Sequence, residues 1–491
     1  MVFYVLYNAN NKYMTREEKA IHGILYADGS YDSLPVYYLS REWEYYPDVL
    51  LTPGDDLEKY YFRYLSIGEY GGMELDDRNG NPYGSGTYRL RIMLPSEEHT
   101  YGLYLPEIFS AYNLYVDGKL IEQVGNPDPD HYEERIQHRM FTFKGHTSVE
   151  IMIAVTDKDS ASPGIQYVPA FGNPLKVNTV RGIPVFLNSS VFTLVLLVLI
   201  FSVWAFFRTR SRANALFAGV CVCVLGYTCY PLLHTYLALR VQPWFSLEML
   251  FYYLTFPAML LLEHEITGRK YKWVWWLVGF TAAAGIGATV AGIFAGGMET
   301  AALFYGVSAV TEVLKWFTAI CLVVIAFFYT EGTRGLPLLA GTVLYASSLA
   351  ADRIWPLYDP IIGGWFPEWG GTILAGVFGV ILWRELTDGY RMRLIYEEQS
   401  RQMELRLMMQ KEHYEKLTGA LEEASRTRHD MRQYIRTASM LLEEEHYEQL
   451  REYFHQFAKE SSEKMQAPMC YCKNMSVDAI LHYYAGQLED A

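Results

Sequence analysis

The chain has 491 residues, a hydrophobic content of 51% and a formal net charge of −14 at pH 7. This length allows roughly two to four domains, and the acidic balance excludes nucleic acid as an expected partner, because binding it needs a basic face. The apolar residues are concentrated between Pro184 and Trp383, and both flanks are polar. We therefore expect a multidomain membrane protein.

Residues 1–182 are predicted to form a β-sandwich or jelly roll. In the stretch TYRLRIML, apolar and aromatic side chains alternate with Arg89 and Arg91, as in a strand with one buried face. Asp117 and Gly118 lie between two apolar runs and indicate a β-hairpin. None of the six cysteines lies in this segment, so no disulfide framework is expected there.

The same segment is rich in tyrosine, which leaves two interpretations open. A Tyr-lined face of the sandwich could bind a carbohydrate or another small polar ligand. Ordinary packing between two sheets explains the same residues, because buried aromatic side chains contribute large apolar areas to a core.

Three stretches of this segment resemble a known family. Leu39–Pro53, Gly84–Pro95 and Leu103–Gly125 are similar to the extracellular galactose-binding-like domain of bacterial seven-transmembrane receptors with diverse intracellular signalling modules. The resemblance implies a sensor of an extracellular small ligand. Such a domain has to be exported, but the apolar run Met1–Tyr7 is too short for a signal peptide. We therefore expect that the given start is truncated or misassigned.

Residues 183–384 are predicted to form a seven-helix transmembrane bundle in a lipid bilayer. Seven apolar stretches are each near or above the roughly 20 residues that cross the hydrocarbon core as a helix, and helices satisfy their own backbone polar groups there. The stretches are Pro184–Phe207, Ala213–Tyr236, Trp244–Glu263, Trp273–Gly296, Thr300–Tyr329, Leu336–Leu357 and Gly363–Trp383.

The loops predict the orientation of this bundle. Basic residues gather after the first, third, fifth and seventh spans, whereas the alternate loops are nearly free of them apart from Arg240. The positive-inside rule then places the N-terminal domain outside a bacterial cell membrane and the C-terminal tail in the cytoplasm. The basic residues are Arg208, Arg210, Arg212, Arg269, Lys270, Lys272, Arg334, Arg384, Arg391 and Arg393.

Two pairs of charged residues lie within predicted spans. Glu312 and Lys315 share one face of the fifth span, and Asp352 and Arg353 lie near the outer end of the sixth. Charges inside a membrane are costly and usually pair or face the bundle interior. The pairs either hold helices together or form a two-state switch or ion path. A transporter is a third reading of these pairs, but the spans show no inverted repeat.

The tail predicts a coiled-coil linker over 385–424 and a helical hairpin over 425–466. A 3.5-residue repeat is typical of a coiled-coil seam, so we expect a parallel homodimer. The segment EEEHYEQ interrupts the repeat, and a second amphipathic helix follows, so two hairpins would form a four-helix bundle. The seam residues are Met403, Leu407, Gln410, Tyr414, Leu417, Leu421, Ala424, Arg428, Met431, Ile435, Ala438 and Leu442.

His429 lies outside this seam, in the stretch SRTRHDMRQYIRT. A neutral imidazole offers one unprotonated nitrogen as a nucleophile, and Asp430 beside it could hold the other N–H. Arg428 and Arg432 are placed to offset phosphate charge. The pattern therefore predicts a phosphoacceptor, although an isolated surface histidine on a helix is ordinarily only solvated.

RHDMRQYIRTASMLLEEEHYEQLREYF and YCKNMSVDAILHYYAGQ resemble the two phosphotransfer helices and the entry into the ATPase domain of sporulation-type sensor histidine kinases. The resemblance implies that His429 accepts the phosphoryl group, that Asp430 is the adjacent acid and that Gln433 orients water. It also implies a response regulator as partner, and ATP and magnesium for the complete kinase.

Residues 467–491 correspond to the start of the ATPase domain in this resemblance. The chain ends at Ala491 without its glycine loops, so we expect that this chain binds neither ATP nor magnesium. An incomplete gene, a receptor phosphorylated in trans and a non-enzymatic receptor or scaffold remain alternatives.

Overall fold

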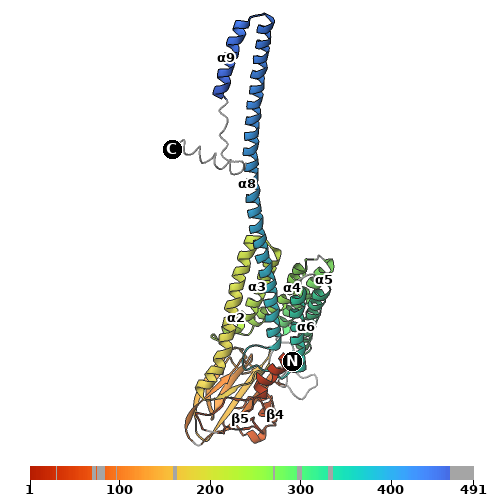
Figure 1. Cartoon of the computed structure of the whole chain (residues 1–491). Helices are drawn as coiled ribbons and strands as arrows, with labels where there is room; N and C mark the ends of the chain where they lie inside the picture. The colour runs from red at the N-terminus through yellow and green to blue at the C-terminus, as the bar shows by residue number, and fades with distance from the viewer. Residues whose placement is uncertain are drawn as a thin grey trace. The chain divides into compact units, whose positions relative to one another are not determined.

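The computed structural model describes residues 1–28, 30–68, 73, 83–95, 97–158, 163–268, 271–295, 301–329 and 335–464. The chain divides into two compact units between Thr387 and Asp388, and each unit is described by itself (Figure 1). The predictions for Arg269, Lys270 and Arg334 and for the segment 467–491 lie outside the described residues.

Two β-sheets form the N-terminal part of the first unit. A seven-stranded sheet has the order β4-β3-β5-β10-β7-β8, with β1 pairing in parallel with β5, and a four-stranded sheet has the order β2-β11-β6-β9. The strands are β1 Ile24–Tyr26, β2 Tyr37–Tyr38, β3 Trp43–Pro47, β4 Arg63–Leu65, β5 Gly84–Met93, β6 His99–Leu105, β7 Ala111–Val116, β8 Lys119–Val124, β9 Arg139–Gly145, β10 Ser148–Asp157 and β11 Ala170–Gly172. Three short helices accompany them: α1 Val2–Ala9, η1 Lys12–Met14 and η2 Leu57–Lys59.

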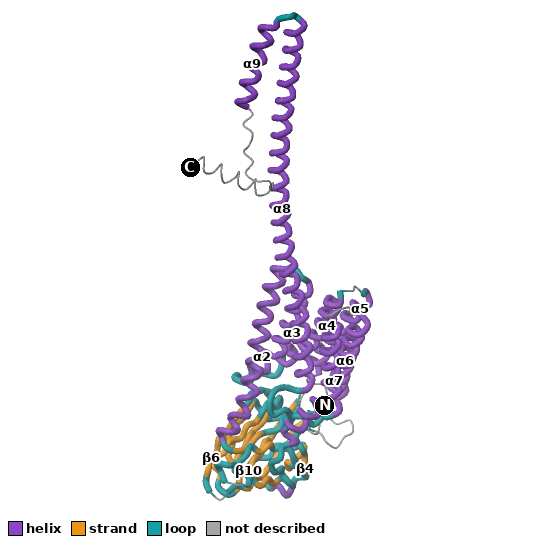
Figure 2. The backbone as a smooth tube through the Cα atoms, viewed as in Figure 1, coloured by secondary structure: helices purple, strands orange, loops and turns teal. Residues whose placement is uncertain are grey.

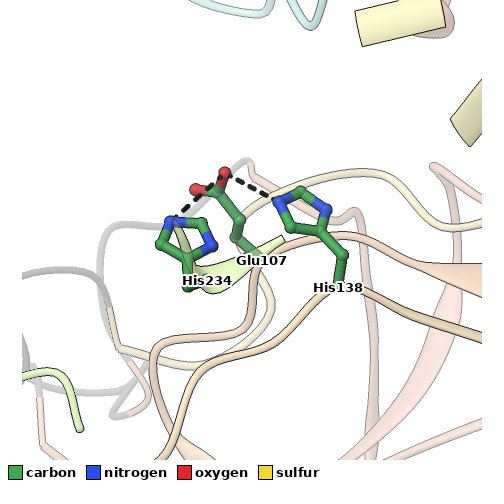
Figure 3. A group of neighbouring side chains, drawn as sticks. All are labelled: Glu107, His138 and His234. Atoms are coloured by element: carbon green, nitrogen blue, oxygen red, sulfur yellow. Dashed lines mark hydrogen bonds and ion pairs between the residues drawn. The ribbon is translucent and has the colours of Figure 1, made fainter. Parts of the chain in front are cut away.

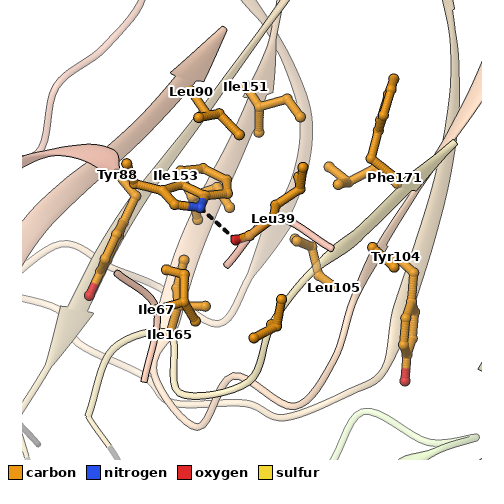
Figure 4. Close-up of a cluster of buried hydrophobic side chains, with 14 of the residues drawn as sticks. Leu39, Ile67, Tyr88, Leu90, Tyr104, Leu105, Ile151, Ile153, Ile165 and Phe171 are labelled. Carbon is orange, nitrogen blue, oxygen red and sulfur yellow. Dashed lines mark hydrogen bonds between the residues drawn. The ribbon is translucent and has the colours of Figure 1, made fainter. Parts of the chain in front are cut away.

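The main core of this domain contains inward-facing residues of both sheets (Figure 4). Leu90 of β5 and Ile151 of β10 contribute from one sheet, and Leu105 and Phe171 contribute from the other. The predicted two-sheet domain is therefore observed, and Tyr88, Leu90 and Ile92 of β5 all belong to this core, as the pattern predicted. Asp117 and Gly118 connect β7 to β8 with φ values of 46° and 76°, as a tight hairpin turn requires.

The opposite face of β5 carries a buried cation. Arg91 is exposed, but Arg89 is buried, and its Nη1 lies 2.6 Å from Oε2 of Glu44. Its Nε also donates to Oε2 of Glu150 at 2.8 Å. Because a buried charge is costly unless it is paired and hydrogen-bonded, this three-residue network accounts for a cation inside the domain.

Seven long helices follow the sheets in the chain. They are α2 Pro174–Thr209, α3 Arg212–His234, α4 Trp244–Thr267, α5 Lys272–Ala295, α6 Ala301–Tyr329, α7 Gly335–Ile354 and α8 Phe366–Glu443. Within the described residues, six of these helices are long and apolar enough to cross a membrane, and α7 falls outside that set. Asp352 and Arg353 near its end lower its apolar character, so seven spans remain a prediction.

The first helix begins earlier than the predicted span. Pro174 stands at its N-terminus, and the side chain of Asn173 accepts a hydrogen bond from the backbone N–H of Leu175 at 3.0 Å. Pro184, taken as the start of the span, lies inside α2. The helix begins here for two reasons. The Asn173 side chain accepts a hydrogen bond from one of the free N–H groups at the helix N-terminus, and Pro174 has no N–H that would need a partner.

Within the described residues, the second unit contains the hydrophilic part of α8 and the helix α9, Tyr447–Lys464. The helix ends within the predicted interruption, where Glu445 adopts a left-handed conformation with φ of 57°. Figure 2 shows α8 and α9 as a helical hairpin joined by this short turn. The ring centroid of Tyr434 on α8 lies 4.7 Å from that of Phe457 on α9, so the two helices pack through aromatic side chains.

Candidate functional site

His429 lies on the hydrophilic part of α8 with its side chain 78% exposed. Its Nδ1 is 3.5 Å from Oδ1 of Asp430, a separation longer than a normal hydrogen bond. Arg432 and Gln433 are exposed on the same helix. The imidazole is therefore open to a reacting partner, and a carboxylate lies on its Nδ1 side.

The hairpin of α8 and α9 carries an apolar groove that begins at Met431, two residues after His429. Several of its residues remain open to solvent, with Ile435 63% exposed and Phe454 54% exposed. The groove is lined by Met431, Tyr434, Ile435, Ala438, Ser439, Leu442, Leu450, Tyr453, Phe454 and Phe457. Arg428 lies at the edge of a second hollow that includes Ala424 and Met431.

A second point of interest is the contact between the sandwich and the loop that precedes α8. Asp359 in this loop lies 2.8 Å from Nζ of Lys12 through Oδ1 and accepts a hydrogen bond from the backbone N–H of Val168 through Oδ2 at 2.9 Å. The side chains of Lys12 and Asp359 are only 11% and 7% exposed. This buried pair joins the sandwich directly to the segment from which α8 begins.

The N-terminal residues strengthen the same contact. Asn10 and Ile362 exchange two hydrogen bonds, with Nδ2 donating to the backbone oxygen at 2.7 Å and the backbone N–H donating to Oδ1 at 2.8 Å. The rings of Phe3 and Phe366 also meet edge to face, 5.6 Å apart. The loop before α8 is therefore held from two sides.

The charged pairs predicted within spans have different environments. Nζ of Lys315 donates to Oε1 of Glu312 at 2.7 Å within α6, and the two side chains are 17% and 44% exposed. Asp352 is half-buried and Arg353 is exposed near the end of α7. The first pair is thus a local bridge on one helix.

A group of possible metal ligands lies where the sandwich meets α3 (Figure 3). Oε1 of Glu107 is 3.1 Å from Nε2 of His138 and 3.8 Å from Nε2 of His234. Burial alone would raise the pKa of the Glu107 carboxyl, but the hydrogen bond with His138 and the proximity of His234 hold that pKa below its usual value. The carboxyl is therefore ionised at neutral pH.

Sequence reasoning did not single out these three residues. They come from segments that are far apart in the chain, and no spacing connects them. Neither does the structure bring His429 or the pairs in α6 and α7 into this group. The sequence showed only that these side chains can bind a metal. The chain has 12 histidines, so residue type alone does not distinguish these two from the others before the fold brings them together.

Most tyrosines of the sandwich belong to its interior, as the packing interpretation expects. Tyr45, Tyr88, Tyr101 and Tyr112 are buried. A smaller aromatic patch is open to solvent beside β4, and its members are Tyr60, Tyr61, Phe62 and Tyr64, with exposures of 39% to 65%. The patch therefore offers aromatic faces to a ligand.

No family model matches the chain, and no curated protein matches it. Part of the chain is similar to solved glycosidase structures. The GH2 β-galacturonidase from Eisenbergiella tayi bound to galacturonate is 12% identical with a TM-score of 0.21, over 28% of this chain and 24% of that chain.

The β-glucuronidase of Faecalibacterium prausnitzii is 12% identical with a TM-score of 0.19, over 26% of this chain and 22% of that chain. The β-glucuronidase of Ruminococcus gnavus is 10% identical with a TM-score of 0.21, over 28% of each chain. The chain thus spans about a quarter of the length of these enzymes.

Proposed function

We propose that the chain is the sensor and phosphoacceptor part of a membrane histidine kinase of a two-component system. An extracellular small ligand would bind the sandwich, and the helices would carry the signal to His429. His429 would then accept a phosphoryl group and pass it to an aspartate of a response regulator. The observation that carries this proposal is that one helix, α8, contains both the apolar segment with buried Phe366, Leu374 and Phe378 and the exposed His429.

The chemistry at His429 follows from its surroundings. If Asp430 holds the proton on Nδ1, the lone pair of Nε2 is free to attack phosphorus. An Nε2–P bond forms as the bond from the terminal phosphorus to ADP breaks, and the positive charge on the ring is offset by Asp430. Arg428 and Arg432 would offset phosphate charge, and Gln433 would orient water for dephosphorylation of the partner. ATP and magnesium would be supplied by a kinase domain, and no described residue is assigned to them.

The buried contact at Asp359 supports a route for the signal. A shift of the sandwich acts on Lys12 and Val168, and both bind Asp359. Asp359 lies in the loop before α8, so the shift would reach the helix that carries His429. A bistable element is needed for such a switch, and the imperfect seam residues Gln410 and Arg428 are candidates.

The exposed apolar residues of α8 and α9 support a homodimer. Met403, Leu407 and Leu421 of the seam are 57% to 71% exposed, and Ile435 and Phe454 of the hairpin groove are also open. A second copy would cover these side chains, with a coiled coil along α8 and a four-helix bundle at the hairpin. His429 lies outside the seam and would stay accessible.

The aromatic patch beside β4 supports a carbohydrate as the ligand. Aromatic faces combine apolar area with polar edges, as at Tyr61 and Tyr64, which are 65% and 42% exposed. If the patch binds a sugar, Tyr61→Ala should weaken binding of that sugar to the purified chain.

The decisive experiment uses the full chain in lipid nanodiscs with the ATPase domain of a complete histidine kinase and γ-labelled ATP. We expect acid-labile label on the parent chain and none on His429→Gln. The matched control is His413→Gln, because His413 is exposed on the same helix and should keep the label. Label that persists in His429→Gln would contradict the proposal.

A non-enzymatic receptor or scaffold is the second candidate. It is favoured by the apolar seam of α8, which could engage a partner without nucleotide. In that case His429→Gln would leave signalling intact, whereas replacing Leu407 or Leu421 by glutamate would abolish it.

A further inference from the structure

We propose that Glu107, His138 and His234 form a binding site for a divalent transition-metal ion, with zinc the best match. The site lies where the sandwich meets the C-terminal end of α3. It stands apart from the phosphoacceptor, and its test needs no kinase activity.

The fold places the three side chains for identifiable reasons. Leu105 at the end of β6 pairs with Arg139 at the start of β9, so Glu107 and His138 emerge beside each other at this edge of the four-stranded sheet. His234 is the last residue of α3. The chain that follows α3 is fixed to the sandwich, because Ile136 and Leu239 exchange two backbone hydrogen bonds of 2.9 and 3.2 Å.

The distances suit a small cation. Zinc binds histidine nitrogen and carboxylate oxygen at about 2.0–2.2 Å, so a tetrahedral arrangement separates its ligand atoms by about 3.3–3.6 Å. Here Oε1 of Glu107 is 3.1 Å from Nε2 of His138 and 3.8 Å from Nε2 of His234. All three ligand atoms lie within 4.8 Å of one another. Drawing the ligand atoms together by up to about 1 Å would complete the site.

The hydrogen-bond partners of His138 allow one tautomer that can coordinate an ion. Its Nδ1 lies 2.8 Å from the hydroxyl oxygen of Tyr104. If Nδ1 keeps the proton and donates it to this oxygen, the lone pair of Nε2 points at Glu107, and an outer partner of this kind orients a metal-binding histidine. Two acceptors, Nε2 and a carboxylate oxygen, then face each other, and a cation between them satisfies both.

His234 gives a second, independent reason. Its side chain is 1% exposed, and within the described residues its Nδ1 is buried without a hydrogen-bond partner. Its Nε2 is 3.8 Å from Glu107, which is beyond a normal hydrogen bond. An ion bound at Nε2 would give this imidazole one strong partner, although Nδ1 itself would stay without one.

The ligand set selects the class of ion. Imidazole nitrogen suits zinc and neighbouring transition metals, whereas calcium and magnesium prefer sites made of oxygen ligands. Three protein ligands leave a fourth position for water or for a small acidic molecule. The ion would bind two residues of the sandwich and one of α3, and so would fasten these two parts of the first unit.

The test uses the full chain, purified in nanodiscs without a histidine tag and stripped with a chelator. We expect one equivalent of Zn²⁺ to bind in calorimetry and Co²⁺ to give visible absorption bands typical of tetrahedral coordination. His138→Gln and His234→Gln should each weaken Zn²⁺ binding more than 100-fold, and Tyr104→Phe by about 10- to 100-fold. The matched control is His131→Gln, because His131 is 77% exposed and pairs with the exposed Asp128 at 3.0 Å.

Folding of each variant is checked by thermal unfolding without metal. If a ligand variant does not fold, Tyr104→Phe still tests the site, because it removes only the hydroxyl and keeps the aromatic ring. The proposal is overturned if the parent binds no Zn²⁺ or Co²⁺, which would leave the cluster as a hydrogen-bonded group of side chains without an ion. It is also overturned if His138→Gln binds Zn²⁺ as the control does.

Discussion

The buried pair of Lys12 and Asp359 allows a quantitative test of how the sandwich is held to the loop before α8. The side chains are about one-tenth exposed or less, and Nζ lies 2.8 Å from Oδ1. Removing one member of a buried ion pair costs about 3–5 kcal/mol, because the other charge stays buried without its partner. We therefore expect Lys12→Met to weaken this contact by about 3 kcal/mol, or roughly 100-fold in its opening equilibrium.

Hydrogen exchange reports this opening at the backbone N–H of Val168, which donates to Oδ2 of Asp359 at 2.9 Å. The protection of this amide should fall roughly 100-fold in Lys12→Met. Asp359→Asn should also lower the protection of Val168. Its side-chain oxygen can still accept the hydrogen bond from Val168, but the charge of Lys12 is then left without a partner. The double variant removes both charges and should cost less than the sum of the single variants.

The control is Lys59→Met. Nζ of Lys59 lies 3.2 Å from Oδ2 of Asp56, but both side chains are more than half exposed, and exposed pairs contribute at most about 1 kcal/mol. The pair does not hold the contact if the amide of Val168 is as well protected in Lys12→Met as in this control. The same conclusion follows if the double variant loses as much free energy as the two single variants together.

Three further predictions concern other sites. A Cβ at Gly86 would overlap the ring of Tyr45, so Gly86→Ala should lower the free energy of unfolding by about 1–3 kcal/mol in denaturant titration, and an unchanged value would contradict the packing. Burial and then Glu44 raise the pKa of Tyr46 to about 12 from 10.0. Because the folded state keeps this proton longer than the unfolded state, stability should fall as pH rises from about 10 to about 12, and Tyr46→Phe should remove that part of the loss in thermal unfolding. Replacing Glu312 by Gln together with Lys315 by Met should alter ligand-dependent labelling of His429 if the pair transmits the signal, and unchanged labelling would dismiss that role.

Local patterns in the sequence predicted the strands, turns and helix ends that depend on interactions between residues close together in the chain. The alternation around Arg89, the turn at Asp117 and Gly118 and the interruption near Glu445 all appear where expected. The helix α2 begins before the predicted span at Pro184, because Asn173 and Pro174 already cap it.

The contacts made by the fold could not be read in the same way. Asp359 binds Lys12 and Val168, residues that are distant in the chain, and Glu107 meets His138 and His234 only after three separate segments assemble. Nothing local marks such residues, since a lone charged or imidazole side chain has the same appearance in a loop or a core. The same holds for Arg89. The alternating pattern predicted which face of the strand it lies on, but not its ion pairs with the carboxylates of Glu44 and Glu150.

The bonds between Asn10 and Ile362 join residues separated by 352 positions. At a ribosomal rate of about 5–20 residues per second, the partner of Asn10 is made roughly 20–70 seconds after it. During biosynthesis Phe3 and Tyr7 are therefore unpacked until Phe366 and Trp355 have been made. In the folded protein these two residues pack against them. Residues 3–10 are therefore secured long after they are made, and this interval is when quality-control proteases and chaperones have access to them.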